Sequence, residues 1–182
     1  MAFRVTRFDI PDLLLIEPVV HEDDRGVFFE TYKCSAFAEI GIEARFVQEN
    51  HSQSRAGVLR GLHYQKRDRA QAKLVRAVAG EVFDVAVDIR RTSATYGQWV
   101  GVTLSAENKL MLYLPQGFAH GFCTLTDAAD VSYQLTCEYA SNHERGIVWN
   151  DPDLQIDWPV DNPVLSPRDR TLPCFADADN DF

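Results

Sequence analysis

The sequence is poor in cysteine and has no long apolar run, and both scarcities narrow the possible classes of protein. None of its four cysteines forms a CxxC pair, so we expect neither a zinc knuckle nor a dithiol redox site. Apolar runs such as LLLI at 13–16 are far too short to cross a bilayer, and no apolar signal core follows Met1. We therefore expect a cytoplasmic protein without a membrane partner. Its cysteines, expected to be small reduced core residues, are Cys34, Cys123, Cys137 and Cys174.

Positive charge is also scarce. The chain has 18 lysines and arginines against 27 aspartates and glutamates, which gives a formal net charge of −9. A general nucleic-acid binder needs a basic surface to displace counterions, so we expect no nucleic-acid partner. A small anionic ligand is compatible with this balance, because a local arginine cluster can bind phosphate inside an acidic protein. The sequence has no P-loop and no GxGxxG motif, so nucleotide hydrolysis and dinucleotide binding have no support.

What the chain does contain is a series of short alternating segments typical of β-strands. Alternation is clearest in EVFDVAVDIR at 81–90, and ETYKCSAFAEIG at 30–41 is the best helix candidate, ending at Gly41. Further strands are predicted at 99–105, 109–115 and 131–139. Many short strands with close turn signals predict a single mainly β domain over 1–182. Its tail, rich in proline and aspartate from about 150 to 182, should wrap this domain.

Asp84 lies between apolar neighbours in the 81–90 segment, and two explanations are open. One face of this strand would carry Val82, Asp84, Ala86 and Asp88. In an antiparallel sheet such a face can simply point to solvent. Alternatively, it lines a ligand cavity inside a barrel.

PQGFAH at 115–120 is similar to the second half-motif of the cupin superfamily, Pro-x-Gly-x-x-His. A metal-binding cupin also needs two histidines one residue apart and a following carboxylate, where this chain reads His63, Tyr64 and Gln65. A catalytic metal site usually has three good protein ligands, and only His63 and His120 are available. The half-motif therefore favours a cupin-type jelly-roll barrel of antiparallel strands, with a few short helices, that depends on no metal.

Three residues have the chemistry to remove and return a proton beside a carbonyl group. His63 is a candidate base, because imidazole titrates near neutral pH, although a lone strand histidine is more often structural. Lys73 lies in the apolar stretch AQAKLVRAV, where a buried ammonium would stabilise a developing oxyanion. Tyr133 in VSYQL is either a core aromatic or a phenol proton donor. Together they form a set of base, enolate stabiliser and acid.

Two arginines are candidates for phosphate binding. Arg25 in DDRGVFFE and Arg60 in VLRGLH each precede a glycine, which permits close approach of the backbone. A free arginine is usually a solvated charge, but two arginines beside glycines and aromatic residues can form a diphosphate clamp.

Longer motifs give the chain a specific resemblance. They are DDRGVFFE (23–30), QENHSQSRAGVLRGLHYQ (48–65), AQAKLVRAVAGEVFDVAVDIRRTSATYGQWVGVTLSAEN (70–108), LPQGFAHGF (114–122), ERGIVWNDPDLQIDWP (144–159) and LSPRD (165–169). In these motifs the chain closely resembles the dTDP-4-dehydrorhamnose 3,5-epimerase family. The resemblance implies a cupin-type jelly roll, usually a homodimer, with neither metal nor any other cofactor. It also implies inversion of dTDP-4-dehydro-6-deoxy-glucose at carbons 3 and 5, which gives dTDP-4-dehydro-L-rhamnose in dTDP-rhamnose biosynthesis.

The resemblance further implies roles for residues that match the family motifs. His63 would be the base, and Asp169 would fix its orientation and tautomer by a hydrogen bond. Lys73 would stabilise the enolate, and Tyr133 would return a proton from the opposite face. The implied substrate-binding positions are Arg25, Phe28, Glu30, Gln48, Asn50, Arg60, Asp84, His120 and Tyr139. Arg168 stands where lysine is common in the family, and a partner chain is expected to complete the nucleotide site through the 23–30 segment.

The residues leave one geometric question and several functions open. Strict alternation places Arg60 and His63 on opposite faces of one strand, so a bulge near Gly61 is required if both face the ligand. One alternative function is an epimerase acting at a single carbon, or on a related dTDP-4-keto sugar of antibiotic biosynthesis. The others are a metal-dependent cupin oxygenase and a sugar-nucleotide-binding module without catalysis.

Overall fold

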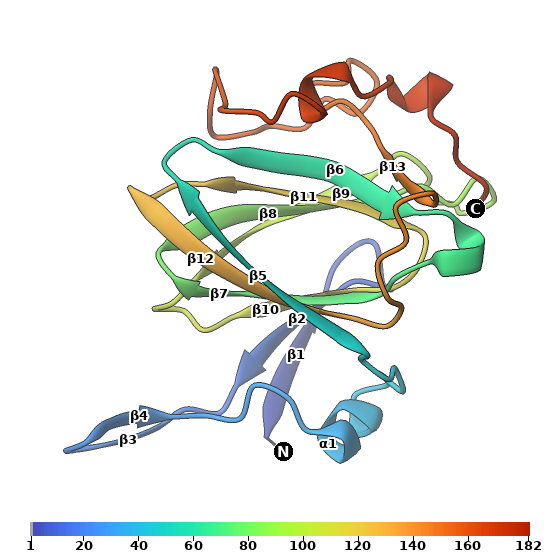
Figure 1. Ribbon diagram of the computed structural model, residues 1–182. Helices are drawn as coiled ribbons and strands as arrows, with labels where there is room; N and C mark the ends of the chain where they lie inside the picture. The colour runs from blue at the N-terminus through green and yellow to red at the C-terminus, as the bar shows by residue number, and fades with distance from the viewer. Residues whose placement is uncertain (1) are drawn as a thin grey trace.

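The computed structural model describes residues 2–182 and consists mainly of two antiparallel sheets that face each other (Figure 1). The first sheet contains, in spatial order, β1 (Phe3–Arg7), β2 (Leu14–Pro18), β10 (Met111–Leu114), β7 (Lys73–Ala79), β12 (Ala128–Leu135) and β5 (Gln48–Arg55). The second contains β13 (Glu144–Gly146), β6 (Leu59–Gln65), β11 (Phe118–Thr124), β8 (Glu81–Asp88) and β9 (Trp99–Ser105). The remaining elements are the hairpin β3 (His21–Asp23) and β4 (Gly26–Phe28), the helix α1 (Cys34–Glu39), and the 3₁₀ turns η1 (Arg67–Arg69), η2 (Asp169–Thr171) and η3 (Phe175–Asp177). The predicted mainly β jelly roll with a few short helices is confirmed.

Strand β8 has two buried faces, which explains its dense apolar alternation. One face places Val82 and Ala86 in a core between the two sheets. The other places Val85 and Val87 in a second core, formed with apolar residues of the C-terminal tail. Full burial of a valine side chain contributes roughly 1.5–3 kcal/mol, so both faces of this strand stabilise the barrel. The solvent-facing explanation for the Asp84 face is therefore wrong, because that carboxylate is fully buried.

The helix α1 covers the end of the first sheet near β1 and β2, and it is shorter than predicted. It begins at Cys34 rather than at residue 30, because the backbone at Lys33 is still extended (φ −149°, ψ 116°) and no side chain caps the helix. Tyr32 lies outside the helix and packs edge-on against Phe37 and Phe46. A third, smaller core thereby forms between α1 and the sheet.

Two predicted strands also differ from the structure at their ends. The strand expected at 109–115 begins at Met111, because Lys109 has a left-handed backbone (φ 58°) and belongs to the preceding turn. The strand expected at 131–139 runs from Ala128 to Leu135, where its pairing with β5 ends. The residues after Leu135 leave the sheet.

Strand β6 contains the irregularity that the alternation of Arg60 and His63 required. Its pairing with β11 shifts register, since His63 lies opposite His120 and Arg60 lies opposite Phe122. One extra residue on β6 is accommodated at Gly61, which has φ 135° and packs so closely that a Cβ would lie 2.5 Å from the Cα of the facing glycine. Both polar side chains can thus point into the barrel.

The tail after β13 runs along the outer face of the second sheet (Figure 1). Asp151 is 2% exposed and accepts the backbone N–H of Phe175 at 2.7 Å. Near the C-terminus, Asp179 pairs with both Lys66 and Arg145. The Asp151 contact joins two parts of the tail, and the pairs of Asp179 hold the tail against the sheet that carries His63. In the part of the chain that the structure describes, no helix is long and apolar enough to cross a membrane.

Candidate active site

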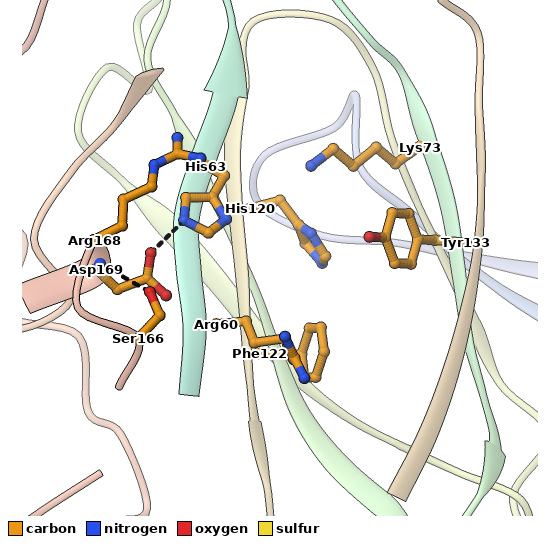
Figure 2. A pocket seen from close by; sticks show the side chains of 9 residues that line it. All are labelled: Arg60, His63, Lys73, His120, Phe122, Tyr133, Ser166, Arg168 and Asp169. Carbon is orange, nitrogen blue, oxygen red and sulfur yellow. Dashed lines mark hydrogen bonds and ion pairs between the residues drawn. The ribbon is translucent and has the colours of Figure 1, made fainter. Parts of the chain in front are cut away.

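A cavity of about 260 Å³ opens between the two sheets and under the tail (Figure 2). The first sheet contributes residues of β7 and β12, the second contributes residues of β6 and β11, and the tail closes one side. The lining residues are Arg60, His63, Lys73, His120, Phe122, Tyr133, Ser166, Arg168 and Asp169. The structure therefore brings together all four predicted catalytic residues, with two of the predicted substrate-binding ones.

His63 is held in this cavity by a carboxylate. Its Nε2 lies 2.7 Å from Oδ1 of Asp169, and the backbone N–H of Asp169 donates to the Ser166 hydroxyl at 3.0 Å. Burial alone would raise the pKa of Asp169, but the hydrogen bond and charge of His63 outweigh it and lower that pKa. A carboxylate at Nε2 favours the tautomer with its proton there, which leaves Nδ1 free on the side that faces the cavity (Figure 2). This imidazole is oriented to accept a proton from a ligand.

Lys73 places a buried cation beside the same space. It is 8% exposed, and burial lowers its pKa from 10.5 to about 8, although the charges of Asp84 and Glu144 act in the opposite direction. The ammonium form therefore still predominates at neutral pH. A desolvated ammonium that points into a cavity can stabilise an oxyanion far better than it could in water.

His120 lies on the floor of the cavity and is backed by Asp84. Its Nε2 lies 3.0 and 3.1 Å from the two carboxylate oxygens of Asp84. Burial lowers the pKa of His120, and the charge and hydrogen bond of Asp84 offset this only in part, so the site favours the neutral ring. Asp84 is not among the lining residues, so it acts on a ligand through two that are, His120 by hydrogen bonding and Lys73 by charge.

Tyr133 approaches from the wall opposite His63. It projects from β12 of the first sheet, whereas His63 projects from β6 of the second. Figure 2 shows its hydroxyl pointing into the space between them. A ligand bound there would have a base on one side and a phenol on the other.

The cavity continues into a second cavity of about 270 Å³. The two have four lining residues in common, His63, Lys73, Tyr133 and Arg168. Its other lining residues are Asn50, Tyr64, Gln65, Gln71, Leu135, Tyr139 and Glu144. We refer to it as the adjoining cavity. Sequence reasoning found Asn50 and Tyr139 here but missed the rest.

Two charged residues that sequence reasoning did not place in the site, Glu144 and Arg168, form a chain of hydrogen bonds with Tyr139 at the junction of the two cavities. Arg168 donates to Glu144, and the Tyr139 hydroxyl donates to the same carboxylate oxygen at 2.6 Å. Burial would raise the pKa of Glu144, but these two donors outweigh it and lower that pKa. The one available signal was that Arg168 directly precedes Asp169 in LSPRD.

The predicted phosphate and nucleotide residues fall into two groups. Arg60 is oriented at the cavity by its Nε, which donates to the Ser54 hydroxyl at 3.0 Å. Gln48 donates to Asn50 at 2.9 Å and accepts the backbone N–H of Tyr139 at 2.8 Å, so it lies behind the adjoining cavity.

The other group is not brought to this cavity within one chain. Arg25, Phe28 and Glu30 lie on or just after the β3–β4 hairpin, which extends away from the barrel (Figure 1). Arg25 pairs with Asp23, and Glu30 pairs with Lys33 at 3.9 Å. Phe28 is 69% exposed. The sequence analysis expected the 23–30 segment to reach the nucleotide site of a partner chain, and this stays a prediction.

The cavity that His63 and His120 line has no set of metal ligands among the described residues. Within residues 2–182, no three side chains of histidine, cysteine, aspartate or glutamate are grouped so that they could hold a metal ion. The two histidines of the cavity each contact a carboxylate of their own, Asp169 for His63 and Asp84 for His120.

A jelly-roll barrel with a carboxylate-held histidine, a buried lysine and an opposed tyrosine defines a class, the cupin-fold isomerases that move protons at carbon. Comparison with known proteins agrees. The family model for dTDP-4-dehydrorhamnose 3,5-epimerase matches residues 7–177. The chain belongs to the dTDP-4-dehydrorhamnose 3,5-epimerase family.

Its relatives include double and single epimerases. The dTDP-4-dehydrorhamnose 3,5-epimerase of Pseudomonas aeruginosa is 60% identical over 97% of this chain and 98% of its own length. The crystal structure of an epimerase from Legionella pneumophila in complex with dTDP-4-keto-L-rhamnose is 48% identical, with a TM-score of 0.92 over 96% of this chain and 93% of that one. A 3'-monoepimerase from Streptomyces bikiniensis in complex with dTDP-quinovose is 37% identical, with a TM-score of 0.88 over 93% of this chain and 87% of that one.

Proposed function

We propose that the protein converts dTDP-4-dehydro-6-deoxy-glucose into dTDP-4-dehydro-L-rhamnose by inverting carbons 3 and 5. The observation that carries this proposal is the placement of His63 and Tyr133 on opposite walls of one cavity, with Lys73 beside them. Inversion requires that a proton leave one face of a carbon and return to the other. No redox cofactor is needed, because only a proton leaves and returns.

The steps follow from the side chains. The carbon-4 ketone acidifies the hydrogens at carbons 3 and 5, and His63 Nδ1 takes one of them while Asp169 stabilises the imidazolium. Lys73 stabilises the enolate oxygen that forms at carbon 4, and Tyr133 returns a proton from the opposite face. A positioned base contributes on the order of 10²–10⁴-fold to the rate, and one preorganised oxyanion partner about 10²–10³-fold.

The nucleotide end of the substrate would occupy the adjoining cavity. Arg60 of the first cavity and the 54% exposed Tyr139 of the adjoining cavity suit a diphosphate and a base respectively, since arginine binds phosphate and an exposed ring can stack on thymine. The relative from Legionella pneumophila, whose structure contains a dTDP-sugar, supports a ligand of this class.

The site would be completed by a second copy of the chain. The β3–β4 hairpin exposes two adjacent apolar side chains, Val27 (52%) and Phe28 (69%), which a second chain could cover. We infer a homodimer in which the hairpin delivers Arg25, Phe28 and Glu30 to the partner's nucleotide site.

We also infer that residues 1–182 act as one cupin-like domain in the cytoplasm. Two observations support this: the tail of about 150–182 supplies Asp169 to the barrel site, and all four cysteines are free thiols. The expectation that they are core residues is wrong for Cys34 and Cys174, which are exposed.

The activity is tested by incubating the protein with dTDP-4-dehydro-6-deoxy-glucose, a rhamnose-forming reductase and NADPH. Formation of dTDP-L-rhamnose that requires wild-type protein and is lost with His63→Ala is the expected result. Full turnover by His63→Ala would contradict the assignment of the base.

A further inference from the structure

Beyond β12 the chain continues as a segment without regular structure, residues 137–140, which carries Tyr139 along the adjoining cavity. The hydrogen-bonded pairing of β12 with β5 ends at Leu135, which lies opposite Gln48. Backbone N–H and C=O groups that leave a sheet need other partners when they are not in water. In this segment, glutamine side chains supply them.

Three glutamines bond four consecutive residues of the segment. Gln71 donates to the carbonyl of residue 137 at 2.8 Å, and Gln48 accepts the N–H of residue 139 at 2.8 Å. Gln65 donates to the carbonyl of residue 138 at 3.3 Å and accepts the N–H of residue 140 at 2.6 Å. All of these bonds reach backbone atoms, so they specify the path of the segment and not its sequence.

Gln65 is the central member of this set. It is 4% exposed, and its amide nitrogen also donates to the carbonyl of Arg69 at 2.6 Å, so both ends of the amide are occupied. A buried amide is costly unless it is bonded in this way, and an apolar residue would fill the same space without that cost. Gln65 also occupies the position where the metal-binding half-motif would have its second histidine. In this chain the side chain at that position bonds the backbone of residues 138 and 140.

The glutamines come from three parts of the chain that also carry active-site residues. Gln65 follows His63 by two positions on β6, and Gln71 precedes Lys73 by two positions. Gln48 lies two positions before Asn50 on β5. The segment is thereby tied to the elements that carry the base, the cation and the polar wall of the adjoining cavity.

We propose that Gln48, Gln65 and Gln71 form a glutamine clamp that positions Tyr139 for the nucleotide end of the substrate. The clamp acts through Tyr139, so its members are positioning residues that set affinity and leave proton transfer to the catalytic groups. This proposal rests on the proposed function, because it takes the adjoining cavity as the nucleotide site.

The test is a double-mutant cycle with dTDP as the probe, measured by calorimetry. Stacking of a base on an aromatic ring is worth about 1–3 kcal/mol, so Tyr139→Ala should raise the dissociation constant roughly 5- to 150-fold. Gln65→Met, of similar length, should raise it several-fold while kcat stays near the wild-type value. In the Tyr139→Ala background, Gln65→Met should add nothing. Additive effects, or an unchanged dissociation constant in the single variant, would overturn the clamp.

A second readout needs neither ligand nor turnover. Amide hydrogen exchange of the peptide covering 136–143 should be faster in Gln65→Met than in the wild type, and an unchanged rate would also overturn the clamp. Gln71→Met gives the same comparison if Gln65→Met does not fold. Gln116→Met is the matched control, because its amide donates to the carbonyl of Ala70 at 3.0 Å and does not touch the segment. Wild-type protein that fails to epimerise would refute the proposed function, while the exchange rates would still decide on the clamp.

Discussion

The Nε2 atom of His63 lies 2.7 Å from Oδ1 of Asp169, although 106 positions separate the two residues in the chain. One belongs to a strand inside the barrel and the other to a 3₁₀ turn of the tail. In the proposed mechanism the tail is therefore part of the active site, because it supplies the carboxylate that would set the tautomer of the base.

Replacing this carboxylate by its amide tests the pair. Asp169→Asn keeps the shape but no longer favours the proton on Nε2, so kcat should fall by about 10²–10⁴-fold while the dissociation constant for dTDP changes little. A loss of binding with unchanged kcat would contradict the role of Asp169.

The same variant should change the acid stability of the fold. The pKa of Asp169 is lowered in the folded state, so this group adds stability above its unfolded pKa of about 3.9 and loses it as pH falls through the lower folded value. Thermal melts from pH 5 down to pH 2 should therefore show a shallower loss of stability for Asp169→Asn than for the wild type. Equal slopes would show that the carboxylate is not stabilised by the fold.

Lys73 should give the reaction an alkaline limit. Its pKa is lowered to about 8, so the ammonium that stabilises the enolate is lost as pH rises through that value, and kcat should fall with it. Lys73→Arg should remove this limit, because arginine stays protonated. Lys73→Met should lower kcat about 10²–10³-fold below pH 8, and the difference from the wild type should shrink above it. An unchanged alkaline limit in Lys73→Arg would assign it to another group.

The lowered pKa of Lys73 also predicts that stability rises over the pH range in which activity falls. Because the folded pKa lies below the unfolded one, the unfolded chain binds more protons between about pH 8 and 10.5, and the free energy of unfolding should rise with pH across that window. The rise should be absent in Lys73→Met, as measured by urea denaturation at several pH values.

Tyr133→Phe should separate removal of a proton from its return. His63 would still exchange hydrogen at carbon from its own side, so deuterium uptake from D₂O should persist while inverted product falls sharply. Proton NMR of substrate and product reads both quantities in one sample. Equal loss of both would show that Tyr133 does not act as a separate acid.

Complementation between subunits tests the proposal that two chains share each nucleotide site. Arg25→Ala and His63→Ala are each expected to be nearly inactive as homodimers. If each site takes Arg25 from one chain and His63 from the other, co-expression should restore about one wild-type site in four. Activity no greater than that of the separate variants would contradict the crossing of the hairpin.

How much the sequence could predict depends on how local the signal was. The alternation of residues 81–90 predicted a strand, and the conflict between Arg60 and His63 predicted the bulge at Gly61, because both follow from the two-residue period of a strand. The burial of Asp84 could not be decided locally, since it depends on which sheet faces the strand. The structure shows that this face is inside.

Other features depend on contacts between distant segments and gave no usable pattern. Glu144 and Arg168 meet at the cavity only because the tail folds back over β13. In the sequence, Gln65 stands where a metal-binding cupin would have a histidine ligand. Its hydrogen bonds to the segment after β12 are visible only in the folded structure. The start of α1 at Cys34 was missed because Lys33 is still extended and Tyr32, outside the helix, packs against distant Phe46 as well as Phe37.

The central claim is tested most directly by proton NMR of dTDP-4-dehydro-6-deoxy-glucose incubated with the wild-type protein in D₂O. We predict deuterium at both carbon 3 and carbon 5, with conversion to the L-rhamno product that the reductase can trap. Deuterium at one carbon alone would instead indicate a mono-epimerase, and the absence of exchange at both would contradict the assignment of His63 as the base.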